Sequence, residues 1–175
     1  GLMVPGSVVE PAARGLLGGI SCGGGPTVEQ RRLLQALVSH LWQSPDLRVS
    51  ALAPLDPEEL ALVLPDPDHR RVVHLLQMTL EFCRHPQTDA QLALGRAYAE
   101  ALGVSSAALE VSRDWLRQGV DQAAADVGRI FTTFCVFLEA DVCGACTILG
   151  SGQFDADAFV VLLVVCLLRG EELIK

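Results

Sequence analysis

Residues 66–85, DPDHRRVVHLLQMTLEFCRH, carry the signals that decide the fold. Asp66 is a typical N-cap residue, and Pro67 follows at the first helical position, where its fixed φ suits a helix. The apolar side chains that come next recur at spacings of three and four residues, which is the period of one helix face. They are Val72, Val73, Leu75, Leu76, Leu80 and Phe82. The stretch therefore predicts an amphipathic helix that ends before Pro86.

The same start signals recur along the chain. Thr27 and Gln30 have the spacing of a capping box, so a helix is predicted over residues 28–43. Further N-caps precede helical patterns, and they are Asp56, Thr88 and Ser105. The last segment, residues 155–175, is rich in valine and could be a buried strand, but its acidic start and its length favour a helix. The sequence predicts an all-α protein, a compact bundle of six to eight helices.

The first 26 residues differ from the rest in composition. They contain scattered glycines and no continuous apolar core, so they do not resemble a signal peptide. Glycine-rich segments behave as flexible chain. We therefore expect a flexible Gly-rich leader over residues 1–26 and a single helical domain over residues 27–175.

The charge and hydropathy of the chain exclude several classes of partner. The formal net charge is -8, which disfavours nucleic acid and anionic membrane surfaces. The apolar run from Ala158 to Leu168 is shorter than the roughly 20 residues that a membrane-spanning helix needs. We expect no transmembrane segment and no nucleic acid, and a partner that is another protein or a second copy of the chain.

The six cysteines are a further guide to location and chemistry. Most of them lie among Phe, Val and Leu, where a free cysteine behaves as a small buried hydrophobe. We therefore expect reduced thiols and a cytoplasmic protein. Cys143 and Cys146 have the spacing of zinc or iron–sulfur ligands, but a structural zinc site needs four ligands and a second pair of similar spacing is missing. The interpretation favoured is a turn between core helices with no cofactor; a zinc or iron–sulfur site is the alternative.

Residues 27 to about 129 resemble the helical TerB-type domain, and more closely actinobacterial proteins related to TerB or to a helical family of ubiquinone biosynthesis. Three segments carry the resemblance: LVSHLWQSPDLRVSALAPLDPEEL (37–60), LEFCRHPQTDAQLALGRAYAEALGV (80–104) and ALEVSRDWLRQGVDQAAADVGR (108–129). The resemblance implies a compact all-α module associated with stress responses. It also implies a metal site at acidic positions. The matching positions are Asp46, Asp56, Glu58 and Glu59.

Three functions are consistent with the sequence. The first is a non-catalytic helical interaction module that binds a protein partner or self-associates, and it is favoured because no Ser-His-Asp order or phosphate loop is present. The second is a bundle that binds an apolar ligand, such as a quinone or a lipid, among four phenylalanines. These are Phe131, Phe134, Phe137 and Phe159. The third is a thiol or metal redox protein that uses Cys143 and Cys146.

Overall fold

A computed structural model describes residues 2–84 and 87–118 of the chain. These residues form helices and no β-strand, which confirms the all-α fold. The α-helices are α1 (Gly6–Gly19), α2 (Val28–Ala36), α3 (Pro57–Val63), α4 (Pro67–Phe82) and α5 (Asp89–Ala101). The π-helical turn η1 (Leu37–Leu41) continues α2, and the 3-10 helix η2 (Val49–Ala51) precedes α3. Residues 106–118 form a further helix.

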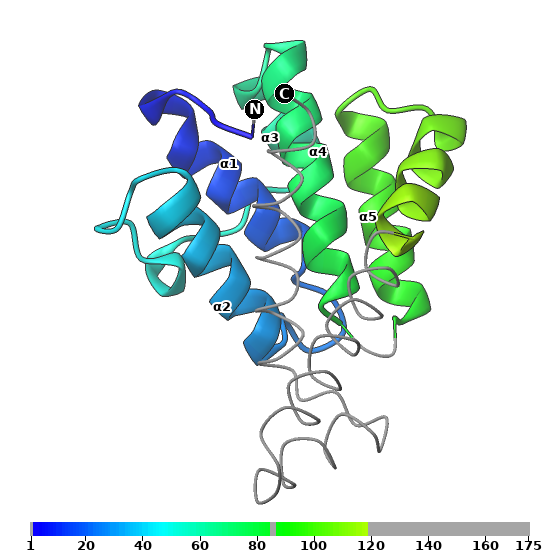
Figure 1. Ribbon diagram of the computed structural model, residues 1–175, viewed down its shortest axis with the longest axis horizontal. Helices are drawn as coiled ribbons and strands as arrows, with labels where there is room; N and C mark the ends of the chain where they lie inside the picture. Colours follow the sequence, from blue (N-terminus) through cyan, green and yellow to red (C-terminus); the bar gives the residue numbers. More distant parts are fainter. Residues whose placement is uncertain (1, 85–86, 119–175) are drawn as a thin grey trace, which may run out of the picture. The chain divides into compact units, whose positions relative to one another are not determined.

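The chain divides into two units, residues 1–113 and 114–175, and the single domain predicted over residues 27–175 stays a prediction. Within the first unit α4 packs against α1, α2 and α5, and α1 packs against α2, α3, α4, α5 and η2 (Figure 1). Its buried side chains form a core with those of the surrounding helices. The largest fully buried apolar ones are Leu16, Ile20, Leu33, Leu34, Leu60, Leu64, Leu76, Met78 and Leu80.

The prediction of a flexible leader is wrong, because residues 6–19 form α1. The apolar face of α1 is fully buried at Ala12 and Leu16. Its glycines allow neighbouring segments to approach closely: a Cβ at Gly15 would overlap the Leu60 side chain of α3, and one at Gly18 would overlap the carbonyl of Leu55, which lies before α3. The glycine content of this segment suggests a flexible chain when it is taken alone. In the structure, glycine is needed at these positions because the neighbouring residues leave no room for a side chain.

The predicted N-caps are confirmed. Thr27 and Gln30 form both hydrogen bonds of a capping box: Gln30 N donates to Thr27 Oγ1 (3.2 Å), and Thr27 N donates to Gln30 Oε1 (3.1 Å). Asp56 forms a second capping box with Glu59. Local hydrogen bonds therefore place the starts of these helices, as the sequence indicates.

The ends of the helices also follow local rules. Gly103, which has a φ of 80°, comes after the last turn of α5, a conformation that glycine adopts without strain. Among the helices described, none is long and apolar enough to cross a membrane.

Candidate functional site

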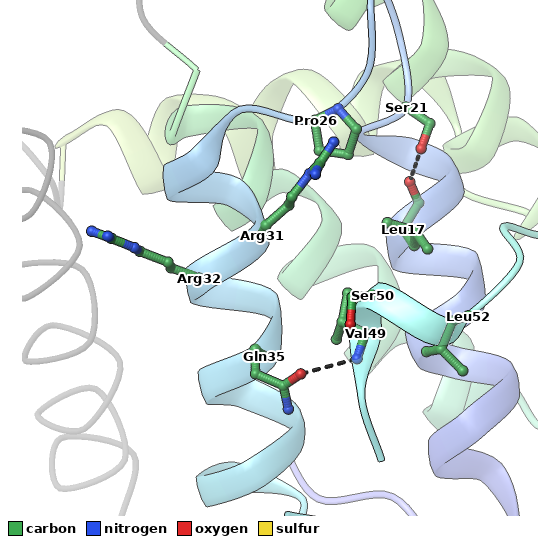
Figure 2. Close-up of a pocket in the computed structure, with 9 residues that line it drawn as sticks. All are labelled: Leu17, Ser21, Pro26, Arg31, Arg32, Gln35, Val49, Ser50 and Leu52. Carbon is green, nitrogen blue, oxygen red and sulfur yellow. Dashed lines mark hydrogen bonds between the residues drawn. The ribbon is translucent and has the colours of Figure 1, made fainter.

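A pocket of about 430 Å³ opens beside α2, and we call it the α2 pocket (Figure 2). Three segments of the first unit build it: the end of α1 with the loop that follows, the outer face of α2, and η2 with the residue after it. Its lining residues are Leu17, Ser21, Pro26, Arg31, Arg32, Gln35, Val49, Ser50 and Leu52. The volume lies within the range of about 300–1,000 Å³ that is typical of ligand sites.

Gln35 fixes the distance between two walls of the α2 pocket. Its Nε2 donates to the Leu47 carbonyl (3.0 Å), and its Oε1 accepts from the Val49 backbone N–H (2.9 Å). These hydrogen bonds tie η2 to α2 across 12 to 14 residues of chain. Val49 itself is buried, so the wall that it forms is anchored in the core.

The loop between α1 and α2 forms the opposite end of the α2 pocket. It passes through three consecutive glycines with positive φ, Gly23 to Gly25, which only glycine adopts readily. The Arg84 guanidinium at the end of α4 donates to the Gly25 carbonyl (2.6 Å). This hydrogen bond fixes the loop, next to Pro26, to the residue that follows the C-cap of α4.

The electrostatics of the α2 pocket differ from those of the whole chain. Its described lining residues include two arginines and no carboxylate, although the chain carries a net charge of -8. Arg31 extends from α2 toward Pro26, whereas Arg32 points away from Ser50 and Leu52 (Figure 2). The apolar side of the pocket comes from the half-buried Leu52 and from Leu17 and Val49, which are mostly buried. The pocket therefore combines an apolar surface with one adjacent cation, Arg31.

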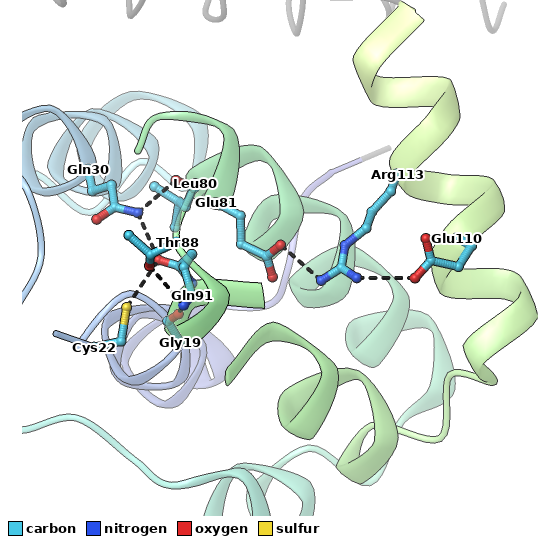
Figure 3. Close-up of polar contacts among 9 residues, drawn as sticks. All are labelled: Gly19, Cys22, Gln30, Leu80, Glu81, Thr88, Gln91, Glu110 and Arg113. Carbon is cyan, nitrogen blue, oxygen red and sulfur yellow. Dashed lines mark hydrogen bonds and ion pairs between the residues drawn. The ribbon is translucent and has the colours of Figure 1, made fainter. Parts of the chain in front are cut away.

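A buried network of two glutamines connects four helices (Figure 3). Gln30 donates to the Leu80 carbonyl (3.0 Å) and to Gln91 Oε1 (3.2 Å), and Gln91 donates to the Gly19 carbonyl (2.8 Å). Gly19 lies in the last turn of α1, where carbonyls have no partner within the helix. The Leu80 carbonyl, in the last turn of α4, accepts from the Cys83 backbone N–H (3.1 Å) as well as from Gln30. The network thus satisfies a last-turn carbonyl of α1 and holds α1, α2, α4 and α5 together.

A buried ion pair joins α4 to the helix over residues 106–118 (Figure 3). Arg113 Nη2 lies 3.2 Å from Glu81 Oε2, and the two side chains are only 5% and 1% exposed. Arg113 also contacts the half-exposed Glu110 at 3.3 Å. A Cβ at Gly95 of α5 would overlap the Glu81 carboxylate. The absence of a side chain at Gly95 therefore lets α5 pack directly against the ion pair. With so little exposed surface, the pair connects helices and offers no face to a substrate.

Burial changes the proton affinities of these groups. It raises the pKa of Glu81 to about 7, although Arg113 and Arg96 act in the opposite direction. Burial and the positive charge of Arg113 lower the pKa of His74. Perturbed pKa values often mark catalytic sites, but such groups must also reach a substrate. Because Glu81 and His74 are enclosed, we interpret their shifts as consequences of packing.

Two of the six cysteines lie among the described residues: Cys22, which is half-buried, and Cys83. Cys22 and Cys83 are both free, and Cys83 is buried among the core residues of α4. Burial raises the pKa of the Cys83 thiol to about 12, with Glu29 adding to the effect. The thiol is therefore protonated at neutral pH and is a poor nucleophile or metal ligand.

Two of the four acidic residues that the TerB resemblance suggests as metal ligands form hydrogen bonds within the structure. Asp56 and Glu59 form the capping box of α3, and Glu58 lies in the first turn of the same helix. Asp46 is exposed in the loop between η1 and η2. Among residues 2–84 and 87–118, no group of three or more His, Cys, Asp or Glu side chains could hold a metal ion.

The other predicted site residues lie outside the described residues. The cysteine pair, Cys143 and Cys146, stays a prediction as a zinc, iron–sulfur or redox site. The same holds for the proposed apolar pocket. Its residues are Phe131, Phe134, Phe137 and Phe159.

The sequence analysis missed both the α2 pocket and the buried ion pair. The pocket is built from segments that meet only in the folded chain, so no local pattern marks it. The adjacent arginines Arg31 and Arg32 on an amphipathic helix of an acidic chain were the one available signal. For the ion pair, the available signal was Glu81, a glutamate within the apolar pattern of α4. A charged side chain at a buried position usually has a partner of opposite charge.

Comparison of the chain with models of known protein families, with curated proteins and with solved structures finds no match. The resemblance to TerB-type domains therefore stays a prediction.

Proposed function

We propose that the chain is a non-catalytic helical interaction module that binds a protein partner through the α2 pocket. The observation that carries the proposal is the pocket itself: an open hollow of about 430 Å³ with apolar residues in its lining, two walls of which are joined by the hydrogen bonds of Gln35. Ser21 and Gln35 use their polar atoms within the protein, at Leu17 O (2.6 Å) and at the η2 segment. A partner would therefore meet walls that are already organised, which lowers the entropy cost of binding.

The polar groups of the core support a structural role for the rest of the unit. The glutamine network and the Glu81–Arg113 pair are enclosed and connect helices. A binding role therefore falls to the surface of the unit, where the α2 pocket lies. Apolar contact with a few adjacent polar groups is typical of protein and peptide recognition.

A peptide selection with a matched pair of pocket variants tests this function. Random peptides displayed on phage would be selected on the full-length protein, and the enriched sequences would be synthesised and titrated individually. Ser50→Trp places a large side chain in the pocket, whereas Ala51→Trp places it one residue away in the same exposed turn. We expect binding that Ser50→Trp weakens at least about tenfold, a loss of about 1.4 kcal/mol, and that Ala51→Trp leaves unchanged.

Three results would contradict the proposal. One is that no selected peptide binds the wild-type protein in solution. Another is equal binding to Ser50→Trp and Ala51→Trp. The third is binding that survives Ser50→Trp but is lost in Leu62→Ser, because Leu62 lies on α3 and is 81% exposed. Sedimentation of both tryptophan variants shows whether the bound partner is a second copy of the chain.

A further inference from the structure

The charge around the α2 pocket is opposite in sign to that of the chain. Residues 17–52, which contain every lining residue, carry three arginines against two carboxylates, while the full chain has a net charge of -8. An acidic partner would therefore meet at this pocket a local charge opposite in sign to the net charge of the chain. Charge complementarity of this kind sets the orientation and the rate of association.

Arg31 is the residue that supplies the positive charge at the pocket. Its side chain is exposed, and it lies beside Gly25, within 3.8 Å of the position that a Cβ would take there. Figure 2 shows the side chain reaching along the pocket toward Pro26. A guanidinium in this position can form a bidentate hydrogen bond with a carboxylate that enters beside Pro26.

The apolar lining indicates what must accompany the carboxylate. Leu17, Val49 and Leu52 offer no hydrogen-bonding side chains, so a fully charged ligand would lose its hydration there without compensation. A ligand that places an apolar side chain on these residues and a carboxylate at Arg31 satisfies both surfaces. An extended peptide supplies this combination when a leucine-type residue lies next to an aspartate or a glutamate.

We propose that the α2 pocket recognises an acidic peptide segment of a protein partner, in which an apolar side chain enters the pocket and a neighbouring carboxylate pairs with Arg31. The inference rests on the proposed function and adds the chemistry of the partner. The excess of positive charge near the pocket favours this ligand over a basic or a neutral segment. The open mouth formed by the exposed residues Ser21, Ser50 and Arg31 allows a chain to enter and leave.

Three synthetic peptides test the proposal by fluorescence anisotropy with the full-length protein. The first has two leucines flanked by glutamates, the second replaces the glutamates with lysines, and the third replaces the leucines with serines. We expect only the first to bind well, with an affinity that falls as salt is added because ions screen the exposed charges. Equal binding of the lysine peptide, or of the serine peptide, would overturn the proposal.

Charge-reversal variants locate the carboxylate. Arg31→Glu should lower the affinity for the glutamate–leucine peptide about five- to tenfold. This is the effect expected when a favourable surface ion pair is replaced by a repulsion between like charges. Arg71→Glu is the matched control, because Arg71 is an exposed arginine of α4 that pairs with Asp68 (2.9 Å) outside the pocket. An equal effect of the two reversals would assign the attraction to overall charge and overturn the role of Arg31.

The outcome separates this inference from the proposed function. Selected peptides that are blocked by Ser50→Trp but carry no acidic residues would leave the α2 pocket as a protein-binding site and refute the acidic partner. The absence of any peptide sensitive to Ser50→Trp would refute both. Circular dichroism of each variant confirms that a loss of binding comes from the surface and not from a loss of helix.

Discussion

At the residue scale, Glu81 connects the stability of the fold to pH. The folded-state pKa of about 7 lies above the ordinary value of 4.5, so the folded chain holds a proton that the unfolded chain releases between these values. The free energy of unfolding should therefore fall as pH rises from about 4.5 to about 7, by about 3 kcal/mol from this group. Urea unfolding at a series of pH values measures the change.

The variant Glu81→Gln isolates this contribution. It keeps the size of the side chain and removes its titration, so the difference between wild type and variant should vary with pH only in that window. His74, whose pKa is lowered, destabilises the fold on acidification, but it is present in both proteins and cancels in the difference. A difference that stays constant from pH 4.5 to 7 would show that Glu81 is not shifted.

Arg113 gives the second prediction at this scale. Arg113→Leu leaves the Glu81 carboxylate buried without its partner, which typically costs about 3–5 kcal/mol at a pH where the group is charged. The double variant Glu81→Leu with Arg113→Leu removes both charges and should recover most of that loss. Chemical denaturation at pH 8 measures all three proteins, and a double variant as unstable as the single one would contradict the account.

These residues show the limit of sequence-based reasoning. Thr27 and Asp56 could be assigned as caps because their partners are three residues away, and the backbone geometry is local. Glu81 and Arg113 are separated by 32 residues, so their pairing depends on how two helices pack. The α2 pocket depends in the same way on Gln35, which reaches a segment 12 to 14 residues further along the chain.

At the element scale, Gly95 determines how closely α5 packs on α4. A Cβ at this position would overlap the Glu81 carboxylate, so Gly95→Ala should destabilise the protein by about 1–3 kcal/mol despite the better helix propensity of alanine. Gly6 in α1 is the matched control, since a Cβ there has no neighbour within 4 Å. Thermal unfolding should show Gly6→Ala as neutral or stabilised; a Gly95→Ala protein of wild-type stability would refute the close packing.

The start of α3 offers a test of capping. Asp56→Ala removes the acceptor for the Glu59 backbone N–H (2.8 Å) and should cost about 1 kcal/mol, whereas Asp56→Ser keeps a capping oxygen and most of the stability. Asp46→Ala, in an exposed loop, should change the stability by less than about 0.5 kcal/mol. The three urea-unfolding curves would contradict the interpretation if serine and alanine were equally destabilising.

The helix α1 explains why the start of the chain was mispredicted. Gly15 and Gly18 suggest flexibility in a sequence, because the position of a neighbouring helix is not visible there. In the fold, the Leu60 side chain and the Leu55 carbonyl occupy the space that side chains at Gly15 and Gly18 would need. The apolar spacing of Val9, Ala12 and Leu16 was the signal for a helix face, and composition concealed it.

At the scale of the whole molecule, the buried polar groups of the first unit hold its helices together, and we propose that binding takes place at its surface. The core contains its own polar links, the glutamine network and the Glu81–Arg113 pair, and these hold the helices of the first unit. The α2 pocket lies on the outer side of α2, where an acidic protein presents an apolar surface and a cation. Recognition of a partner at this place is the central claim.

The measurement that tests the claim most directly is a nuclear magnetic resonance titration of the full-length protein with the glutamate–leucine peptide. The account predicts that the largest shifts fall on the backbone amides of Val49, Ser50 and Leu52 and on the loop at Pro26, and that Ser50→Trp abolishes them. Shifts centred on Leu62, shifts spread evenly over the surface, or no shifts at saturating peptide would contradict it.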